Sequence, residues 1–520
     1  MSAASSTCRT CSGCGSFEPI QGRLSPSDHL VSVRPDPTPR LPLHLALAGL
    51  DFDMRREPAG VDLTRLDNLQ WRADACGSGS ILLFQRHDDG RSDAELIRRY
   101  LTGRRFGALI VNEHMDGLDD LIDRAVYVTG PARWGETLQR LCDAVFPMDW
   151  SRLPIAGVTG TNGKTSTIKY LEAILLARGR RVLSIGTLGL FVDGVKSDDT
   201  GFTSPPYLEL RRLLYRYREQ VDCVVMEVSS HALAQGRVHG LRLATAGWTN
   251  FTQDHLDYHK TEAAYFTAKT RIFDMLAPNA RLYSTSTPLA ERLRALSEPP
   301  ASLQLLSLPE LPAAALAERP FLALDYNQAN LAIAMAMAND LAPVVTEQPP
   351  PWRALAPVPG RFDTRVCGSR TIVIDFAHTP DALDNVLSAI RGAFPDARLM
   401  TLFGCGGDRD HGKRPAMGAA VARWSDRIIV TSDNPRFESP EKIIADILPG
   451  IDGKAHQVIV DRREAIAALF DQLAKRPEDE PWVALIAGKG HEPYIDRNGV
   501  KEPYSDAEQV ATQIHRLGWA

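Results

Sequence analysis

The segment GVTGTNGKTST, residues 157–167, has residue types and spacing that favour binding of a nucleoside triphosphate. It lies between an apolar, strand-like run and an amphipathic helical stretch, where a phosphate loop belongs. Its glycines let backbone N–H groups turn toward an anion, and the helix N-terminus adds positive potential. Lys164 can reach the β- and γ-phosphates, and Thr165 can bind Mg²⁺. Val158 breaks the strict G-x4-G-K-T pattern, yet an ordinary tight turn explains the segment less well.

A bound triphosphate needs a cation to neutralise its phosphates, and two further residues are candidates to hold it. Glu227 ends the buried strand-like run VDCVVMEV and is well placed as a direct or water-mediated Mg²⁺ ligand. His255, in TQDHLDYH, is the second candidate. Taken alone, this histidine fits a hydrogen-bonded structural role better than a metal ligand.

Strand-like and helical stretches alternate along most of the chain, which predicts an α/β protein with parallel, doubly wound sheets. The five prolines of EQPPPWRALAPVPGR, residues 347–361, indicate a stiff linker. We therefore predict four parts: a disordered tail over residues 1–40, a small N-terminal α/β domain over 41–150, a central P-loop domain over 151–346 and a C-terminal domain over 352–520.

Composition excludes several classes of protein. The 520 residues carry a net charge of −5, which argues against a nucleic-acid or anionic-membrane partner. No apolar run suits a membrane span or a secretory signal. Eight cysteines are too few for a disulfide framework, which fits a reducing cytoplasm. We also expect a monomer. Cys8, Cys11 and Cys14 have C-x2-C-x2-C spacing, but three thiolates in a Ser/Gly-rich segment favour a disordered tail over a metal site.

Several separate motifs, in the right order, resemble those of the Mur ligases. They are TGTNGKTS, EVSSHAL, TNFTQDHLDYH, DNPR and GKGHE, and the resemblance spans about residues 153–506. Within the family, DNPR resembles the signature of the branch that adds diaminopimelate as the third residue of the peptidoglycan stem peptide. The resemblance implies a UDP-binding N-terminal domain, a central ATPase domain and a Rossmann-like C-terminal domain.

The resemblance also implies the chemistry, with ATP and Mg²⁺ as cofactors and small molecules as the partners. ATP would phosphorylate the free carboxylate of UDP-N-acetylmuramoyl-alanyl-glutamate. The amine of meso-diaminopimelate would then attack the acyl phosphate, and phosphate would leave. A carboxylate is unreactive toward amines, so this activation is physically necessary. Stabilising the negative charge that develops calls for Lys164 and Mg²⁺.

Lys269, in YFTAKTRIF, matches a carbamylated lysine that positions magnesium in the family. A neutral lysine attacks CO₂ to give an anionic carbamate, which can bind a hard cation. The local pattern alone predicts an exposed helix lysine, and only the family context favours the carbamate. The implied metal set is Thr165, Glu227, His255 and carbamylated Lys269, and the implied catalytic set is Lys164, Glu227, Lys269 and His255.

The resemblance extends to the binding of ATP and of the acceptor. Asn327, in DYNQANLA, matches an asparagine that reads an adenine edge, although a helix N-cap is an equally good interpretation. The implied ATP set is Gly160, Thr161, Asn162, Gly163, Lys164, Thr165, Ser166, Asn327, Asn330, Arg361, Asp375 and His378. The implied acceptor set is Thr203, Ser204, Ser229, Gln235 and Arg237.

The amino-acid site is predicted in the last domain, where DNPR follows the strand-like run RIIVT. The carboxyl ends of parallel strands are where open sheets bind ligands. Arg436 can bind a carboxylate through two parallel hydrogen bonds, and Glu492 can pair with an ammonium. An alternative is that Arg436 forms an ordinary surface salt bridge. The implied set is Arg409, Asp433, Asn434, Arg436, Gly488 and Glu492.

The N-terminal domain departs from the family pattern. Trp71-Arg72-Ala73-Asp74 stands where a Ser/Asp-Ser-Arg motif is usual. A related ligase that joins an amino acid to a different carboxylate is therefore an alternative. A non-catalytic scaffold is another, but it should have lost Lys164, Glu227 or Lys269. Folylpolyglutamate synthases, another branch of the family, lack DNPR.

Overall fold

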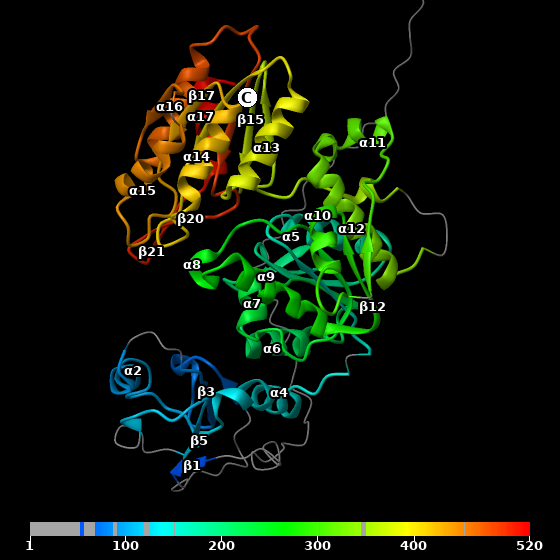
Figure 1. The fold of residues 1–520 in the computed structure, drawn as a ribbon, viewed down its shortest axis with the longest axis vertical. Helices are drawn as coiled ribbons and strands as arrows, with labels where there is room; N and C mark the ends of the chain where they lie inside the picture. Colours follow the sequence, from blue (N-terminus) through cyan, green and yellow to red (C-terminus); the bar gives the residue numbers. More distant parts are fainter. Residues whose placement is uncertain are drawn as a thin grey trace, which may run out of the picture.

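The computed structural model describes residues 53–56, 68–86, 91–118, 125–149, 151–300, 302–344, 350–451 and 453–519. The predicted tail, with Cys8, Cys11 and Cys14, lies outside the described residues. Three large sheets follow one another along the chain, and Figure 1 shows the central one between the other two on the long axis. None of the helices described is both long and apolar enough to cross a membrane.

The first sheet has the order β1-β5-β4-β3-β2 and is parallel except for β1. The apolar runs SILLF and ALIV form its strands β3 and β4. Its elements are β1 (Asp53–Arg56), β2 (Asn68–Gln70), β3 (Ser80–Phe84), α2 (Asp93–Tyr100), β4 (Ala108–Val111), β5 (Ala125–Val128) and α4 (Trp134–Val145).

The central sheet has the order β13-β12-β11-β6-β10-β7-β8-β9. Apolar cores lie on both of its faces, as expected for a sheet covered by helices. Its strands are β6 (Ile155–Thr159), β7 (Val182–Gly186), β8 (Gly189–Val192), β9 (Val195–Asp198), β10 (Cys223–Glu227), β11 (Leu243–Trp248), β12 (Leu276–Ser284) and β13 (Leu303–Leu305). Its helices include α5 (Lys164–Ala177), α6 (Tyr207–Tyr217), α7 (Ser230–Ala234), α8 (Leu256–His259), α9 (Glu262–Thr270), α10 (Thr287–Arg294), α11 (Ala313–Glu318) and α12 (Asp325–Leu341).

The predicted parallel sheet is confirmed for β6, β7, β10, β11, β12 and β13, but an antiparallel meander extends its edge. Only two residues connect β7 to β8, too few for a parallel crossover. Asp193 and Gly194 join β8 to β9, both with positive φ, as in the tight hairpin turns that favour Asp-Gly. The Asp193-Gly194 dipeptide is the feature of the sequence that indicates this hairpin, which was not predicted.

The last sheet has the order β14-β15-β19-β16-β17-β18, parallel except for its edge strand β14. The strand-like runs TIVID, LMTLF, RIIVT, QVIV and WVALI correspond to β15, β16, β17, β18 and β19, respectively. The strands are β14 (Asp363–Cys367), β15 (Arg370–Asp375), β16 (Arg398–Phe403), β17 (Arg427–Val430), β18 (His456–Val458), β19 (Trp482–Ala487) and the separate hairpin β20 (Tyr494–Arg497) and β21 (Val500–Pro503). The helices are α13 (Pro380–Ala393), α14 (Lys413–Trp424), α15 (Pro440–Ile447), α16 (Arg462–Ala474) and α17 (Asp506–Leu517).

Candidate active site

A large cavity of about 1140 Å³ lies between the central and last sheets. Strand ends and the loops that follow them supply its walls, which is where parallel sheets bind ligands. It is lined by every residue predicted for the site except Gln235. The structure thus brings the predicted ATP, acceptor, metal and amino-acid residues together in one cavity. Their individual roles remain predictions.

The phosphate loop runs from the end of β6 to the start of α5. Gly160 and Gly163 both have positive φ, at 144° and 86°. A Cβ atom at Gly160 would lie 1.9 Å from Thr249 Oγ1, and one at Gly163 would lie 2.4 Å from Asn330 Oδ1. Glycine is therefore required at both positions, for its backbone conformation and for the absence of a side chain.

Lys164 begins α5 and folds back over this loop. Its Nζ donates to the carbonyls of Gly160 at 3.0 Å and Thr161 at 2.9 Å. Burial lowers the pKa of Lys164, and the negative charges of Glu227 and Asp254 partly oppose that effect. The loop therefore holds the Lys164 amino group at the place where phosphates would lie.

Glu227 and Thr165 place carboxylate and hydroxyl oxygens next to each other beside the phosphate loop. Thr165 Oγ1 donates to Glu227 Oε1 at 3.0 Å. The same carboxylate accepts from the backbone N–H of Thr187 at 2.8 Å and from its hydroxyl at 3.2 Å. Glu227 is only 1% exposed. A buried carboxylate beside a hydroxyl is the donor chemistry that a hard cation prefers, so these residues fit a magnesium site.

Lys269 is buried, so the prediction from its local pattern, an exposed helix lysine, is wrong. It is 1% exposed because α9 packs its last turn against the phosphate loop. Its Nζ donates to the Gly160 carbonyl at 2.8 Å and approaches Thr159 Oγ1 at 3.4 Å. Burial, reinforced by the neighbouring Lys164 charge, lowers the pKa of Lys269 well below its ordinary value. Its surroundings therefore favour the uncharged amine, which is the form that attacks CO₂.

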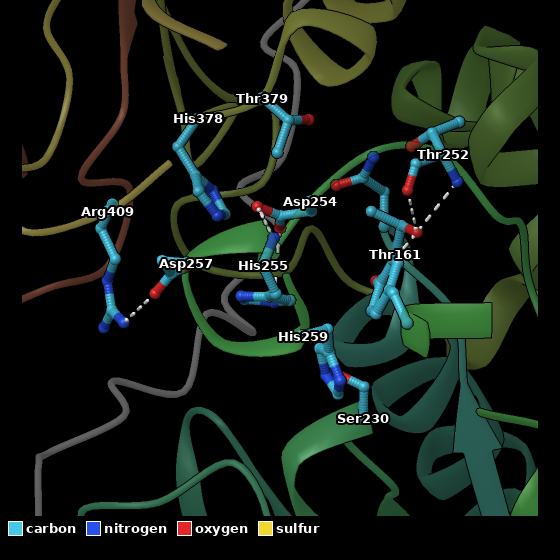
Figure 2. Close-up of polar contacts among 12 residues, drawn as sticks. Thr161, Ser230, Thr252, Asp254, His255, Asp257, His259, His378, Thr379 and Arg409 are labelled. Atoms are coloured by element: carbon cyan, nitrogen blue, oxygen red, sulfur yellow. Dashed lines mark hydrogen bonds and ion pairs between the residues drawn. The ribbon is translucent and has the colours of Figure 1, made fainter. Parts of the chain in front are cut away.

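A cluster of acidic and histidine side chains lies beside the loop, as Figure 2 shows. His255 has a left-handed backbone conformation, and its Nε2 lies 3.4 Å from Asp254 Oδ2. Burial lowers the pKa of His255 well below its usual value, which leaves a lone pair available to a metal. His231, whose ring centroid lies 4.9 Å from that of His255, also lines the cavity. Neither Asp254 nor His231 was predicted as a site residue from the sequence, although Asp254 lies in TNFTQDHLDYH and His231 lies in EVSSHAL.

The predicted acceptor residues form a connected group at the end of β10. Ser204 Oγ donates to the Glu227 carbonyl at 2.9 Å and accepts from the N–H of Ser229 at 3.0 Å. Arg237 Nη1 donates to the Ser204 carbonyl at 3.1 Å. Gln235 lies outside the cavity lining and accepts from Arg237 Nε at 2.8 Å. It therefore aims the arginine rather than facing the cavity.

The predicted nucleotide residues come from two sheets. Asn327 is not a helix N-cap, because α12 begins one turn earlier, after Leu324. Its Nδ2 donates to the Phe321 carbonyl at 2.9 Å. From the last sheet, Arg361 lies 4.2 Å from the centre of the Phe376 ring, and its Nη2 lies 3.5 Å from Thr165 Oγ1. Further cavity-lining members are Asn330, Asp375 and His378.

The predicted amino-acid residues gather where β17 and β19 end. Asn434 Nδ2 donates to Glu492 Oε2 at 2.8 Å. Arg436 has φ +53°, and its Nη1 donates to the Gly407 carbonyl at 2.7 Å. Within the described part of the chain no carboxylate forms a salt bridge with Arg436, so the alternative of an ordinary surface salt bridge is wrong. Arg409 Nη1 donates to Asp257 Oδ2 at 3.2 Å, so it contacts a residue of the central part of the chain (Figure 2).

Comparisons with known proteins agree on one family. The Mur ligase middle domain matches residues 158–304, and the Mur ligase glutamate ligase domain matches residues 360–490. The UDP-N-acetylmuramoyl-L-alanyl-D-glutamate–2,6-diaminopimelate ligase of Aquifex aeolicus is 38% identical over 379 residues, which cover 69% of this chain and 77% of that protein. The ligase of the same name from Synechococcus elongatus is 35% identical over 505 residues, covering 90% and 94%.

Solved structures of Mur ligases also match this chain. A UDP-N-acetylmuramoyl-L-alanyl-D-glutamate–2,6-diaminopimelate ligase matches with a TM-score of 0.52 and 29% identity, covering 87% of this chain and 95% of that one. The MurF ligase from Thermotoga maritima in complex with ADP matches with a TM-score of 0.51 and 16% identity, covering 87% and 98%, and so supports the fold alone. With two relatives above 30% identity covered over most of their length, the chain belongs to the Mur ligase family.

Proposed function

We propose that this protein is an ATP-dependent ligase that joins meso-diaminopimelate to the glutamate carboxylate of UDP-N-acetylmuramoyl-alanyl-glutamate in peptidoglycan biosynthesis. One observation carries the proposal. The phosphate loop and the Asp433–Arg436 turn line the same cavity, so a triphosphate and an amino acid can meet there. The names of the related ligases support this choice of substrates. The cytoplasmic location and the monomeric state remain predictions.

In the first step, an acceptor carboxylate oxygen attacks the γ-phosphorus of ATP, the bond to the β-phosphate oxygen breaks, and ADP leaves. The loop N–H groups and Lys164 stabilise the charge on the transferring phosphoryl group. Ser204, Ser229 and Arg237 hold the acceptor's peptide portion beside Glu227. This arrangement brings the carboxylate to the phosphate instead of leaving the encounter to diffusion.

In the second step, the neutral amine of the amino acid attacks the acyl carbon, the carbon–oxygen bond to phosphate breaks, and the proton that the amine loses goes to the leaving phosphate. The turn at Asp433–Arg436 orients the amino acid, because Arg436 and Glu492 offer opposite charges to the two charged groups at its far end. A zwitterionic head matches that pair, whereas the side chain of lysine offers only an ammonium.

The residues present fit a magnesium ion. Thr165, Glu227, His255 and a carbamylated Lys269 are the residues that would hold it. When bound, Mg²⁺ neutralises phosphate charge and polarises the transferring group. Among the described residues no three His, Cys, Asp or Glu side chains gather as a metal site by themselves. Magnesium commonly completes its coordination with substrate phosphates, so this donor set is sufficient.

The proposal is tested by measuring phosphate release and peptide formation with a panel of acceptor carboxylates, supplying either meso-diaminopimelate or lysine. We expect turnover with the UDP-muramoyl dipeptide and a strong preference for diaminopimelate. Arg436→Ala should raise the KM for diaminopimelate steeply and narrow its advantage over lysine, because the distal carboxylate loses its partner. Equal kcat/KM for the two amino acids in the wild type, or turnover only with another carboxylate, would overturn the assignment.

A further inference from the structure

Lys489 is a fully buried lysine that the proposed reaction does not use. It lies between β19 and β20, is 0% exposed, and is not part of the cavity lining. A lysine is almost never fully buried unless it is paired. Its partners are the side chains proposed to hold the far end of the amino acid, which links Lys489 to the amino-acid site.

Three polar side chains of the amino-acid site surround the Lys489 ammonium. Nζ donates to Asn434 Oδ1 at 2.9 Å and to Glu492 Oε2 at 3.1 Å, and it lies 3.9 Å from Asp433 Oδ1. Asn434 Oδ1 also accepts from the backbone N–H of Asp496 at 2.9 Å. These contacts fix the Asn434 amide, so that its Nδ2 donates to Glu492. Lys489 thereby determines where the Asp433–Asn434 and Glu492 side chains lie.

The formal charges of Lys489, its two acidic partners and Arg436 sum to zero. Asp433 and Glu492 contribute two negative charges, and Lys489 and Arg436 contribute two positive charges. Burial raises the pKa of Glu492, and the adjacent Lys489 opposes that rise, so the ammonium helps to keep the carboxylate ionised. A neutral set of fixed charges suits a ligand head that is itself neutral but carries both signs. Without Lys489 the set would have a net negative charge and would favour a lone ammonium.

We propose that Lys489 is a positioning residue that sets the charge selectivity of the amino-acid site, directing it toward a zwitterionic head and away from the single ammonium of lysine. The inference rests on the proposed function, because it concerns the same amino acid. It acts through Asn434, Asp433 and Glu492 rather than through contact with the substrate.

The test compares kcat and KM for meso-diaminopimelate and for lysine in the wild type and in Lys489→Met. We expect the diaminopimelate-to-lysine ratio of kcat/KM to fall by about 30-fold or more, with most of the change in KM. The KM for ATP should stay close to that of the wild type. Lys475→Met, which changes an exposed lysine at the end of α16, is the matched control and should leave all values unchanged.

A second variant separates charge from packing. Lys489→Met combined with Glu492→Gln removes one negative charge as well, and should recover part of the preference for diaminopimelate. Circular dichroism and Tm show whether Lys489→Met is folded. If it is not, Lys489→Arg, which keeps the positive charge, takes its place in the test. We expect Lys489→Arg to keep the preference for diaminopimelate. An unchanged ratio in Lys489→Met, or an equal loss with both amino acids that the double variant does not relieve, would overturn the inference. A wild type that ignores diaminopimelate would instead overturn the proposed function.

Discussion

The Lys269 amine shows how one residue's chemistry is set by its surroundings. A lysine in water is charged, but this one is enclosed by the phosphate loop and lies near a second ammonium, that of Lys164. Both effects disfavour the protonated form. The nearest acceptors, the Gly160 carbonyl and the Thr159 hydroxyl, are neutral, so neither stabilises a positive charge as a carboxylate would. The surroundings of Lys269 thus favour the uncharged amine over the ammonium.

We expect wild-type activity to fall when the enzyme is depleted of CO₂ and to return on addition of bicarbonate, because the neutral amine can then form its carbamate again. Lys269→Ala and Lys269→Arg, neither of which can carry the carbamate, should lose on the order of 10³-fold in kcat/KM at limiting Mg²⁺. Phosphate release measures the loss, and carbon-13 NMR after ¹³CO₂ labelling detects the carbamate. Full activity of Lys269→Ala, or no response of the wild type to bicarbonate, would contradict the prediction.

At the scale of elements, a buried arginine joins α14 to the loop that follows β17. Arg414 is 0% exposed, and its guanidinium donates to Glu438 Oε1 at 2.8 Å and to Asp446 Oδ2 at 2.8 Å. Glu438 also accepts from the backbone N–H of Asp408. Because Glu438 lies two residues after Arg436, this network holds the amino-acid loop against the loop that follows β16.

Glu438 gives this network a pH dependence. The Arg414 guanidinium, as the main cause, lowers the pKa of Glu438 from 4.5 to about 2. A carboxyl whose folded-state pKa is depressed stabilises the fold above its unfolded pKa and loses that contribution as pH falls through the folded value. We expect the Tm difference between wild type and Glu438→Gln to be largest at about pH 6. It should shrink as the pH falls from 4.5 to about 2. Glu478→Gln, at an exposed position, is the control, and a pH-independent difference would contradict the prediction.

The elements also show what could be predicted from sequence and what could not. The apolar runs, the glycine loop and the DNPR turn are local signals, and they led to the correct strands and to cavity-lining residues. Lys269 and Lys489 depend on tertiary packing, because a lysine on a helix or after a strand has the same local pattern whether it is buried or exposed. Asn327 was ambiguous for a related reason, since a cap depends on where the helix begins, and helix ends are the least certain feature of a sequence pattern.

At the scale of the whole molecule, the site exists only where the central and last sheets meet. Side chains cross that boundary at several points. Asn162 Nδ2 donates to Asp381 Oδ2 at 3.3 Å, and Arg409 pairs with Asp257 at 3.2 Å. Lys413 Nζ lies 3.5 Å from Asp254 Oδ1, and the two side chains are only 8% and 5% exposed. Figure 2 shows the Arg409–Asp257 pair and His378 beside Asp254, with Arg409 and His378 in loops that follow strands of the last sheet. The contacts bring the amino-acid residues toward the phosphate loop.

The Lys413–Asp254 pair is the most buried of these charged contacts, so its removal gives the sharpest test of how the two halves stay together. Burial acts to raise the pKa of Asp254, but its electrostatic interactions with His255 and Lys413 outweigh that effect and lower the pKa below the ordinary value. In Lys413→Met the Asp254 carboxylate would stay buried without this cation, at a cost of about 3–5 kcal/mol. Separation of the two parts would expose the Asp254 carboxylate to water and relieve that cost, so we expect an arrangement with the two parts apart to become populated.

We therefore expect Lys413→Met to show a larger radius of gyration by small-angle X-ray scattering, together with lower kcat/KM for both ATP and the amino acid. Both substrates should be affected because the cavity takes its lining residues from both parts of the chain, and separating the two parts weakens each site. Lys413→Arg keeps the charge at the boundary and should stay compact and retain more activity. If Lys413→Met kept the wild-type radius and lost activity toward the amino acid alone, the lysine would belong to the amino-acid site and would not hold the two halves together.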